Sequence, residues 1–194
     1  LTILGQSDTP MLLLRSPAGQ YILINGESEP ATLSEEIETM LPPFKRELAF
    51  VIIPSCTLNQ TSGLFGLTRQ VNISHVLWGC DPGDRQVSKR LWNAFAAEGI
   101  SQARLTGAEQ LNFQQGILTF TVESGNLQAL ELVQAGFSGM ELFDDQIQPA
   151  QTASLLVQPW QTELAPSTAQ VWVLTGEGTR DNADNAVWAG SYRW

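Results

Sequence analysis

Apolar residues along this chain come in short runs that Gly, Pro, Asn and Ser separate. Runs of this length, rich in β-branched residues, are typical of strands buried in a sheet. Pro17 and Gly19 have the spacing of a turn, so the runs on either side of them form a predicted hairpin. The runs predicted as strands are 1–4, 11–16, 21–25, 48–53, 73–78, 103–105, 116–122, 129–134, 139–143, 154–157 and 170–174.

Helical spacing of apolar residues is found in fewer places. The predicted helices are 32–41, a short segment at 64–67, and 85–98. The first has Thr32 and Glu35 in a capping-box pattern at its start, and Pro42 and Pro43 end it. Strands and helices alternate early and strands dominate later, which predicts a single α/β or α+β domain over residues 1–194.

The composition narrows the class of protein. A chain of 194 residues is long enough for one substantial core, and it has no apolar run of the roughly 18 residues that a transmembrane helix needs. It begins with Leu1 directly in an apolar run, without a signal-peptide pattern. We therefore expect a domain excised from a longer protein, which can itself be a membrane protein.

The charge of the chain bears on its partners. The formal net charge is −10, and no Lys or Arg lies between Arg104 and Arg180. Affinity for nucleic acid comes mostly from neutralising phosphates, so direct binding to DNA or RNA is not expected. An acidic surface is otherwise typical of a soluble domain.

A polar segment follows the predicted strand 48–53, at the strand end where α/β folds build their sites. Strand, loop and short helix resemble the signature of the metallo-β-lactamase superfamily, in which Thr-His-x-His-x-Asp-His-x-Gly-Gly holds two zinc ions. The resemblance implies an αββα sandwich, with two mixed sheets flanked by helices. Aligned without a gap, the ligand positions of that signature are Ser55, Thr57, Asn59 and Gln60.

None of these side chains suits the metal of that superfamily. Zinc takes imidazole, thiolate or carboxylate ligands and binds hydroxyls and amides poorly. The one histidine, His75, sits inside an apolar run. Asp145 (or Asp144) stands where the resemblance implies a bridging Asp, and Trp160 lies where a later His-His segment is implied and can fill the vacated space. We therefore expect no metal, no cofactor and no metal-dependent hydrolysis.

A narrower resemblance concerns the order of three motifs. Residues 3–8 read Ile-Leu-Gly-Gln-Ser-Asp, residues 17–19 read Pro-Ala-Gly, and residues 23–27 read Leu-Ile-Asn-Gly-Glu. This order resembles the extramembrane domain of competence-type DNA-uptake channels. The resemblance implies an extracytoplasmic domain of a membrane protein that works with the membrane part of its own chain. Since the ligands are replaced, we expect an inactive domain with a scaffold, interaction or regulatory role.

The main alternative is a binding module that reuses the former metal cleft. Uncharged hydrogen-bonding side chains suit a polar small molecule or a peptide, although no particular ligand is identified. The residues expected to line this cleft are Ser55, Thr57, Asn59, Gln60, Asn25 and Asp145. A metal-independent hydrolase or nuclease has less support, because Cys56 and His75, the one nucleophile–base pair considered, fall at opposite ends of their predicted strands.

Cys56 and Cys80 each follow a predicted buried strand. If these strands are parallel and direct neighbours, their ends lie about 4.8 Å apart, within reach of a disulfide. The resemblance places the domain outside the cytoplasm, where such a bond persists. Two buried free thiols are the alternative, because free cysteines often simply pack in a core.

Overall fold

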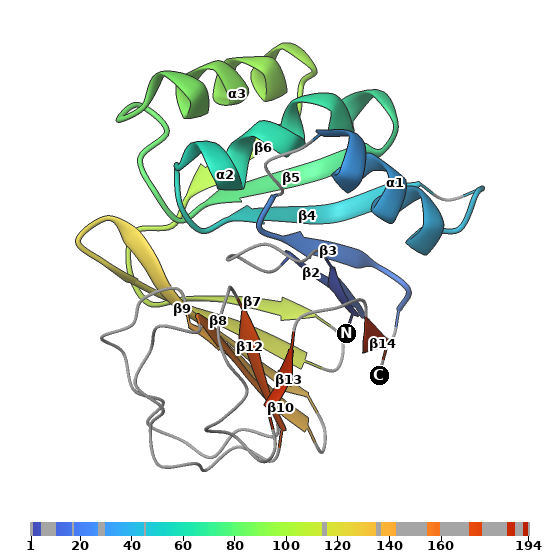
Figure 1. Ribbon diagram of the computed structural model, residues 1–194. Coiled ribbons are helices and arrows are strands. Elements are labelled where there is room, and N and C mark those ends of the chain that lie inside the picture. The colour runs from blue at the N-terminus through green and yellow to red at the C-terminus, as the bar shows by residue number, and fades with distance from the viewer. Residues whose placement is uncertain are drawn as a thin grey trace.

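The structure of the chain is a computed structural model in which two sheets lie face to face and helices cover one of them (Figure 1). It describes residues 2–4, 11–16, 18–26, 30–44, 46–113, 116–134, 137–142, 155–159, 171–175, 186–188 and 192–193. None of the helices among these residues is long and apolar enough to span a bilayer.

Sheet A contains most of the first half of the chain. In hydrogen-bonded order its strands are β14 (Tyr192–Arg193), β1 (Thr2–Leu4), β2 (Met11–Arg15), β3 (Tyr21–Ile24), β4 (Glu47–Ile53), β5 (Asn72–Trp78) and β6 (Ser101–Arg104). Strands β3 to β6 are parallel, whereas β1 pairs antiparallel with β14 and β2, and β2 pairs antiparallel with β3. The predicted β2–β3 hairpin is present, and Gly19 adopts the left-handed φ of 79° that its turn requires.

Sheet B contains the second half. Its order is β13 (Ala186–Trp188), β12 (Val171–Thr175), β11 (Leu155–Pro159), β10 (Phe137–Leu142), β9 (Asn126–Gln134), β8 (Gly116–Glu123) and β7 (Glu109–Phe113). β7 to β10 form an antiparallel meander, and β10 to β13 are parallel. Ser124 and Gly125, both with positive φ, make the tight turn between β8 and β9. Both sheets are therefore mixed.

The helices are α1 (Pro30–Met40), α2 (Leu58–Thr61), the 3-10 helix η1 (Ser62–Arg69) and α3 (Gln86–Ala97). The capping-box prediction is wrong in position: α1 begins at Pro30, so Thr32 lies in its first turn. Pro is favoured there because the N–H it lacks has no helical partner. The short helix predicted at 64–67 is the middle of a longer helical segment, α2 followed by η1.

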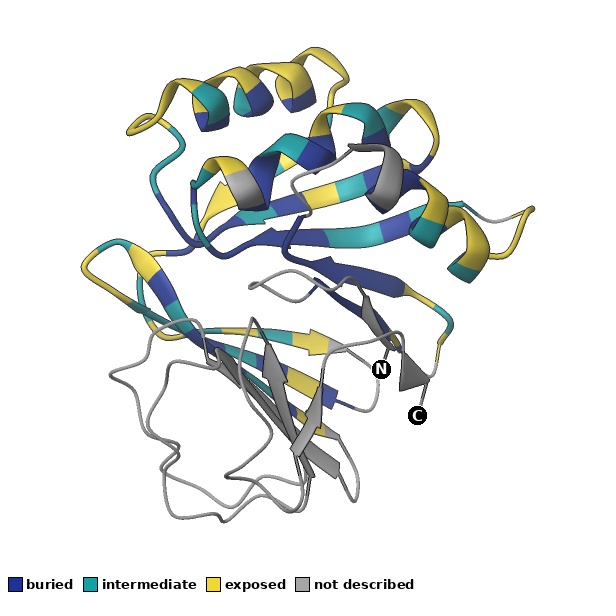
Figure 2. Cartoon of the chain, in the orientation of Figure 1, coloured by how far each residue is buried: buried dark blue, intermediate teal, exposed yellow. Residues whose placement is uncertain are grey.

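The core has two layers, one on each face of sheet A. Leu23, Val51 and Val76 of sheet A pack in the layer that contains Leu33 of α1 and Phe95 of α3. Ile22, Ile24 and Ile52 of the same strands pack in the layer shared with sheet B. The members from sheet B are Leu118, Phe120, Leu127, Leu130 and Leu132. Sheet A is thus the central layer of the molecule (Figure 2).

Candidate functional site

The carboxyl-terminal edge of sheet A gathers the segments that leave the parallel strands β3 to β6. Three backbone hydrogen bonds continue the sheet by one residue beyond the strands. The Asn25 N–H donates to the Ile52 carbonyl, the Gly79 N–H to Ile53, and the Leu105 N–H to Trp78, each over 2.8 Å. The loops after these strands are consequently held against one another at the place where the sequence predicts the site.

The loop after β4 carries the predicted ligand positions. Ser55 and Thr57 are half-buried, Gln60 is buried in α2, and Asn59 lies in the same helix with its side chain outside the described residues. Thr57 holds the N-cap position of α2 without a side-chain capping bond, and its carbonyl accepts a hydrogen bond from the Thr61 hydroxyl at 2.7 Å. The loop thus turns directly into the helix, as the strand–loop–helix pattern predicts.

Asn25, at the end of β3, meets this helix. It is buried with φ of 71°, a left-handed conformation that Asn tolerates, and its side-chain oxygen accepts a hydrogen bond from the Gly26 N–H at 3.1 Å. A Cβ on Gly26 would lie 2.5 Å from the Gln60 carbonyl oxygen, so only glycine allows this approach. The structure therefore brings Asn25 and Gln60, two residues of the predicted cleft, to the same place.

One polar atom at this place has no partner. The Gln60 Oε1 atom is buried and makes no hydrogen bond in the described part of the chain. A buried amide oxygen without a partner costs about 1–3 kcal/mol, so such atoms are rare unless something binds them. Nothing in the sequence distinguishes Gln60 in this way, because burial depends on how α2 packs.

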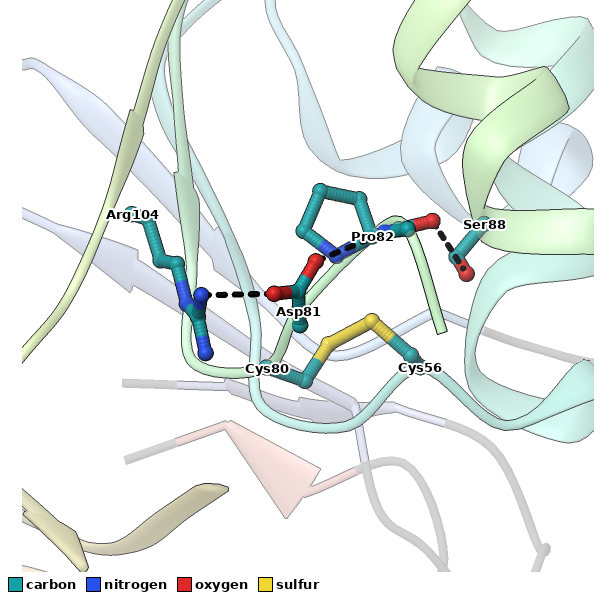
Figure 3. Close-up of polar contacts among 7 residues, drawn as sticks. Cys56, Cys80, Asp81, Pro82, Ser88 and Arg104 are labelled. Atoms are coloured by element: carbon teal, nitrogen blue, oxygen red, sulfur yellow. Dashed lines mark hydrogen bonds and ion pairs between the residues drawn. A yellow bond between two sulfur atoms is a disulfide. The ribbon is translucent and has the colours of Figure 1, made fainter. Parts of the chain in front are cut away.

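A disulfide joins the loop after β4 to the turn after β5. Cys56 and Cys80 are bonded, with their Cα atoms 5.7 Å apart, and both are buried (Figure 3). Of the two alternatives that the sequence left open, the structure has the bridge. The reason is the one that the sequence suggested: β4 and β5 are parallel, direct neighbours, so their ends lie one strand spacing apart.

The turn beyond Cys80 is held by Asp81. One carboxylate oxygen accepts a hydrogen bond from the Gly83 N–H at 2.8 Å, and the other contacts the Arg104 guanidinium at 2.7 Å (Figure 3). The Ser88 hydroxyl donates to the Pro82 carbonyl at 3.0 Å and so ties the turn to α3. The turn follows the signal that Asp-Pro-Gly after a buried strand gives, whereas the contacts with Arg104 and Ser88 depend on how β6 and α3 pack.

The residues of this edge do not fit a zinc site. Its described donors at the predicted ligand positions are hydroxyls and a carboxamide, and the structure's described residues contain no group of three His, Cys, Asp or Glu that can hold a metal. His75 instead lies exposed within β5 and stacks on Phe50, with ring centroids 5.1 Å apart. Cys56 is in the disulfide, so the Cys56–His75 pair does not form. Asp144, Asp145 and Trp160 lie outside the described residues.

Comparisons with known proteins identify the fold. No protein-family model and no curated protein matches the chain. Among solved structures, it is similar to the metallo-β-lactamase fold protein YhfI from Bacillus subtilis, with a TM-score of 0.67 and 14% identity over 94% of this chain and 89% of that one. It is also similar to the short form of human tRNase Z, with a TM-score of 0.63 and 12% identity over 90% and 92% of the two chains.

A third similar structure is zinc-bound PqqB from Methylobacterium extorquens, with a TM-score of 0.57 and 11% identity over 77% of this chain; only 58% of PqqB is spanned. Identities this low concern the fold and not the activity. The chain has the metallo-β-lactamase fold.

Proposed function

We propose that this chain is a catalytically inactive domain of metallo-β-lactamase fold, with a scaffold, interaction or regulatory role in a protein of the DNA-uptake channel type. One observation carries the proposal. The positions that would hold zinc in the signature carry Ser55, Thr57, Asn59 and Gln60, and none of these side chains is a zinc ligand. A partner in the membrane part of the same chain accords with the three motifs that resemble the channels.

The geometry of the edge supports the same proposal. A catalytic loop of this fold must present its ligands to a metal and to substrate. Here Gln60 is buried beneath Gly26, and Cys56, between the first two ligand positions, is bonded to Cys80. The acidic chain also gives little electrostatic attraction for a nucleic acid, so the proposed role does not include direct binding of DNA.

Zinc content and nuclease activity test the proposal together. After dialysis against micromolar zinc, the purified chain should contain no stoichiometric zinc by elemental analysis. It should also cleave neither single-stranded DNA nor a small phosphodiester substrate. A zinc-containing protein of the same fold serves as the positive control. Stoichiometric zinc accompanied by phosphodiesterase activity would refute the proposal. The proposed link to a DNA-uptake channel is tested separately, in the full-length chain. Membrane-spanning segments are expected to adjoin this domain there.

A second candidate is supported by the unpartnered Gln60 oxygen. A polar neutral ligand that donates a hydrogen bond to Gln60 Oε1 at the carboxyl edge would satisfy that buried atom. Thermal-shift measurements with nucleosides, monosaccharides and short peptides would detect it. Gln60→Leu should then abolish the ligand-induced shift while leaving the unliganded protein at least as stable, because the variant removes an unsatisfied atom and keeps the shape. An unchanged shift in Gln60→Leu would exclude this ligand site.

A further inference from the structure

A pocket of about 530 Å³ opens at the other end of the parallel strands, far from the predicted cleft. It lies where the amino-terminal parts of β3 and β4 meet the carboxyl-terminal part of β7. Its described lining is Ala18, Gln20, Ile22, Ala49, Phe50, Leu111 and Asn112. Phe50 lies within β4 and Ser55 in the loop after it, so their Cα atoms are at most about 16 Å apart, the length of five extended residues.

The pocket exists because sheet B covers the inner face of sheet A incompletely. Ile22 is buried between the sheets, whereas Phe50 and Leu111 at the same interface are only partly buried. His75 is exposed and stacks on Phe50, which holds the phenyl ring at the border of the pocket. Small residues, Ala18 on the turn and Ala49 on β4, leave the space open.

The lining has a definite chemical character. Ile22, Phe50 and Leu111 supply an apolar surface that includes an aromatic ring. Gln20 and Asn112, both exposed, place two carboxamides among the lining residues, each able to donate and accept hydrogen bonds. None of the described lining residues is charged. The lining thus combines apolar and hydrogen-bonding surface, and its volume lies within the range of about 300 to 1,000 Å³ that small-molecule sites span.

We propose that this pocket binds a small, neutral, aromatic molecule that carries hydrogen-bonding groups. The aromatic body packs between Phe50 and Leu111, and its polar groups exchange hydrogen bonds with the Gln20 and Asn112 amides. Neutrality follows from the lining, because none of its described residues carries a charge that could pair with a charged ligand. The site is separate from the former ligand edge and does not depend on the proposed function.

Binding of a neutral probe tests the site. N-phenyl-1-naphthylamine has an apolar aromatic body and one N–H donor, and its fluorescence rises when it leaves water. Its titration into the purified chain should saturate, and the amide NMR shifts it causes should cluster at residues 18–22, 49–50 and 111–112. Shifts clustered at residues 55–60 would overturn this proposal and would instead favour a ligand at the former metal cleft. Fluorescence that does not saturate would also overturn it.

Two matched variants locate the probe. Ala18→Trp fills the pocket from an exposed turn position, and Ala96→Trp places the same side chain on the exposed surface of α3. Ala18→Trp should raise the dissociation constant of the probe at least ten-fold, whereas Ala96→Trp should leave it unchanged. Should Ala18→Trp unfold the turn, seen by circular dichroism, the double variant Gln20→Ala/Asn112→Ala should weaken binding several-fold. Equal affinity in the wild type and in the folded pocket variants contradicts the site.

Discussion

Sheet A and sheet B have the same number of strands, yet they are buried differently. In β2 and β3 of sheet A, consecutive side chains are buried on both faces, because helices lie over one face and sheet B over the other. In β8 of sheet B, buried and exposed positions alternate at the start of the strand. Ile117 and Val133, opposite each other on β8 and β9, are exposed on the face turned away from sheet A.

This difference in burial agrees with the order of apolar and polar residues in the strands. Strands covered on both faces read as continuous apolar runs, and strands covered on one face alternate. Met11-Leu-Leu-Leu and Tyr21-Ile-Leu-Ile follow the first pattern, and Gly116-Ile-Leu-Thr-Phe-Thr follows the second. No helix among the described residues lies over the outer face of β8 and β9. The comparison teaches that β2 and β3 of sheet A are buried on both faces, whereas β8 and β9 of sheet B have one buried and one exposed face.

The largest expected effect comes from neighbouring residues of β3. Leu23 and Ile24 point to opposite faces, and both are fully buried in different core layers. Leu23→Ala and Ile24→Ala should therefore each lower the free energy of unfolding by about 4 kcal/mol, measured by urea denaturation. A loss below about 1 kcal/mol in either variant would show that one face of sheet A is not packed.

The disulfide at the carboxyl edge of sheet A has the next largest expected effect. The two cysteines are 24 positions apart, and a cross-link over such a loop restricts the unfolded chain enough to contribute about 3.5 kcal/mol. The double variant Cys56→Ala/Cys80→Ala should be less stable than the wild type by about this amount. Its stability should not respond to reductant, which is the control. Two alkylated thiols in the non-reduced wild type, found by mass spectrometry, would contradict the bridge.

Gly79 lies at a contact between the two sheets, and its substitution should have an intermediate effect on the free energy of unfolding. A Cβ at this position would clash with the Leu127 Cβ of sheet B and would lie 3.0 Å from the Pro54 carbonyl oxygen. Gly79→Ala should accordingly lower the free energy of unfolding by about 2 kcal/mol through overpacking. Gly107→Ala is the matched control, since nothing lies within 4 Å of a Cβ there. Equal stabilities of the two variants would place sheet B farther from this edge.

The smallest effect is expected on the outer face of sheet B. Ile117 is 38% exposed, so Ile117→Thr should change the free energy of unfolding by no more than about 0.5 kcal/mol. Its neighbour Leu118 is buried between the sheets, and Leu118→Ala should cost about 3 kcal/mol in the same assay. A large loss in Ile117→Thr would mean that a further segment or a partner covers this face.

The sequence predicted most elements because their patterns are local. Strands β1 to β6 of sheet A, the β2–β3 hairpin and α3 agree with the structure to within a few residues at their ends. β7 was missed, since Glu-Gln-Leu-Asn-Phe contains too few apolar residues to stand out, and it forms through its pairing with β8. The short strands β13 and β14 were missed as well, and both pair with strands distant in sequence or with a sheet edge.

By itself the sequence determined that Ser55, Thr57, Asn59 and Gln60 offer hydroxyls and carboxamides, because these are properties of the side chains, and such groups are poor zinc ligands. It also determined where most strands lie, because short apolar runs separated by Gly, Pro, Asn and Ser are a local signal. Only the tertiary structure decided that Cys56 meets Cys80, that Gln60 is buried beside Asn25, and that a pocket opens at Phe50. These contacts join residues far apart in the chain, and they depend on strand order and on how the layers overlap, which local patterns do not encode.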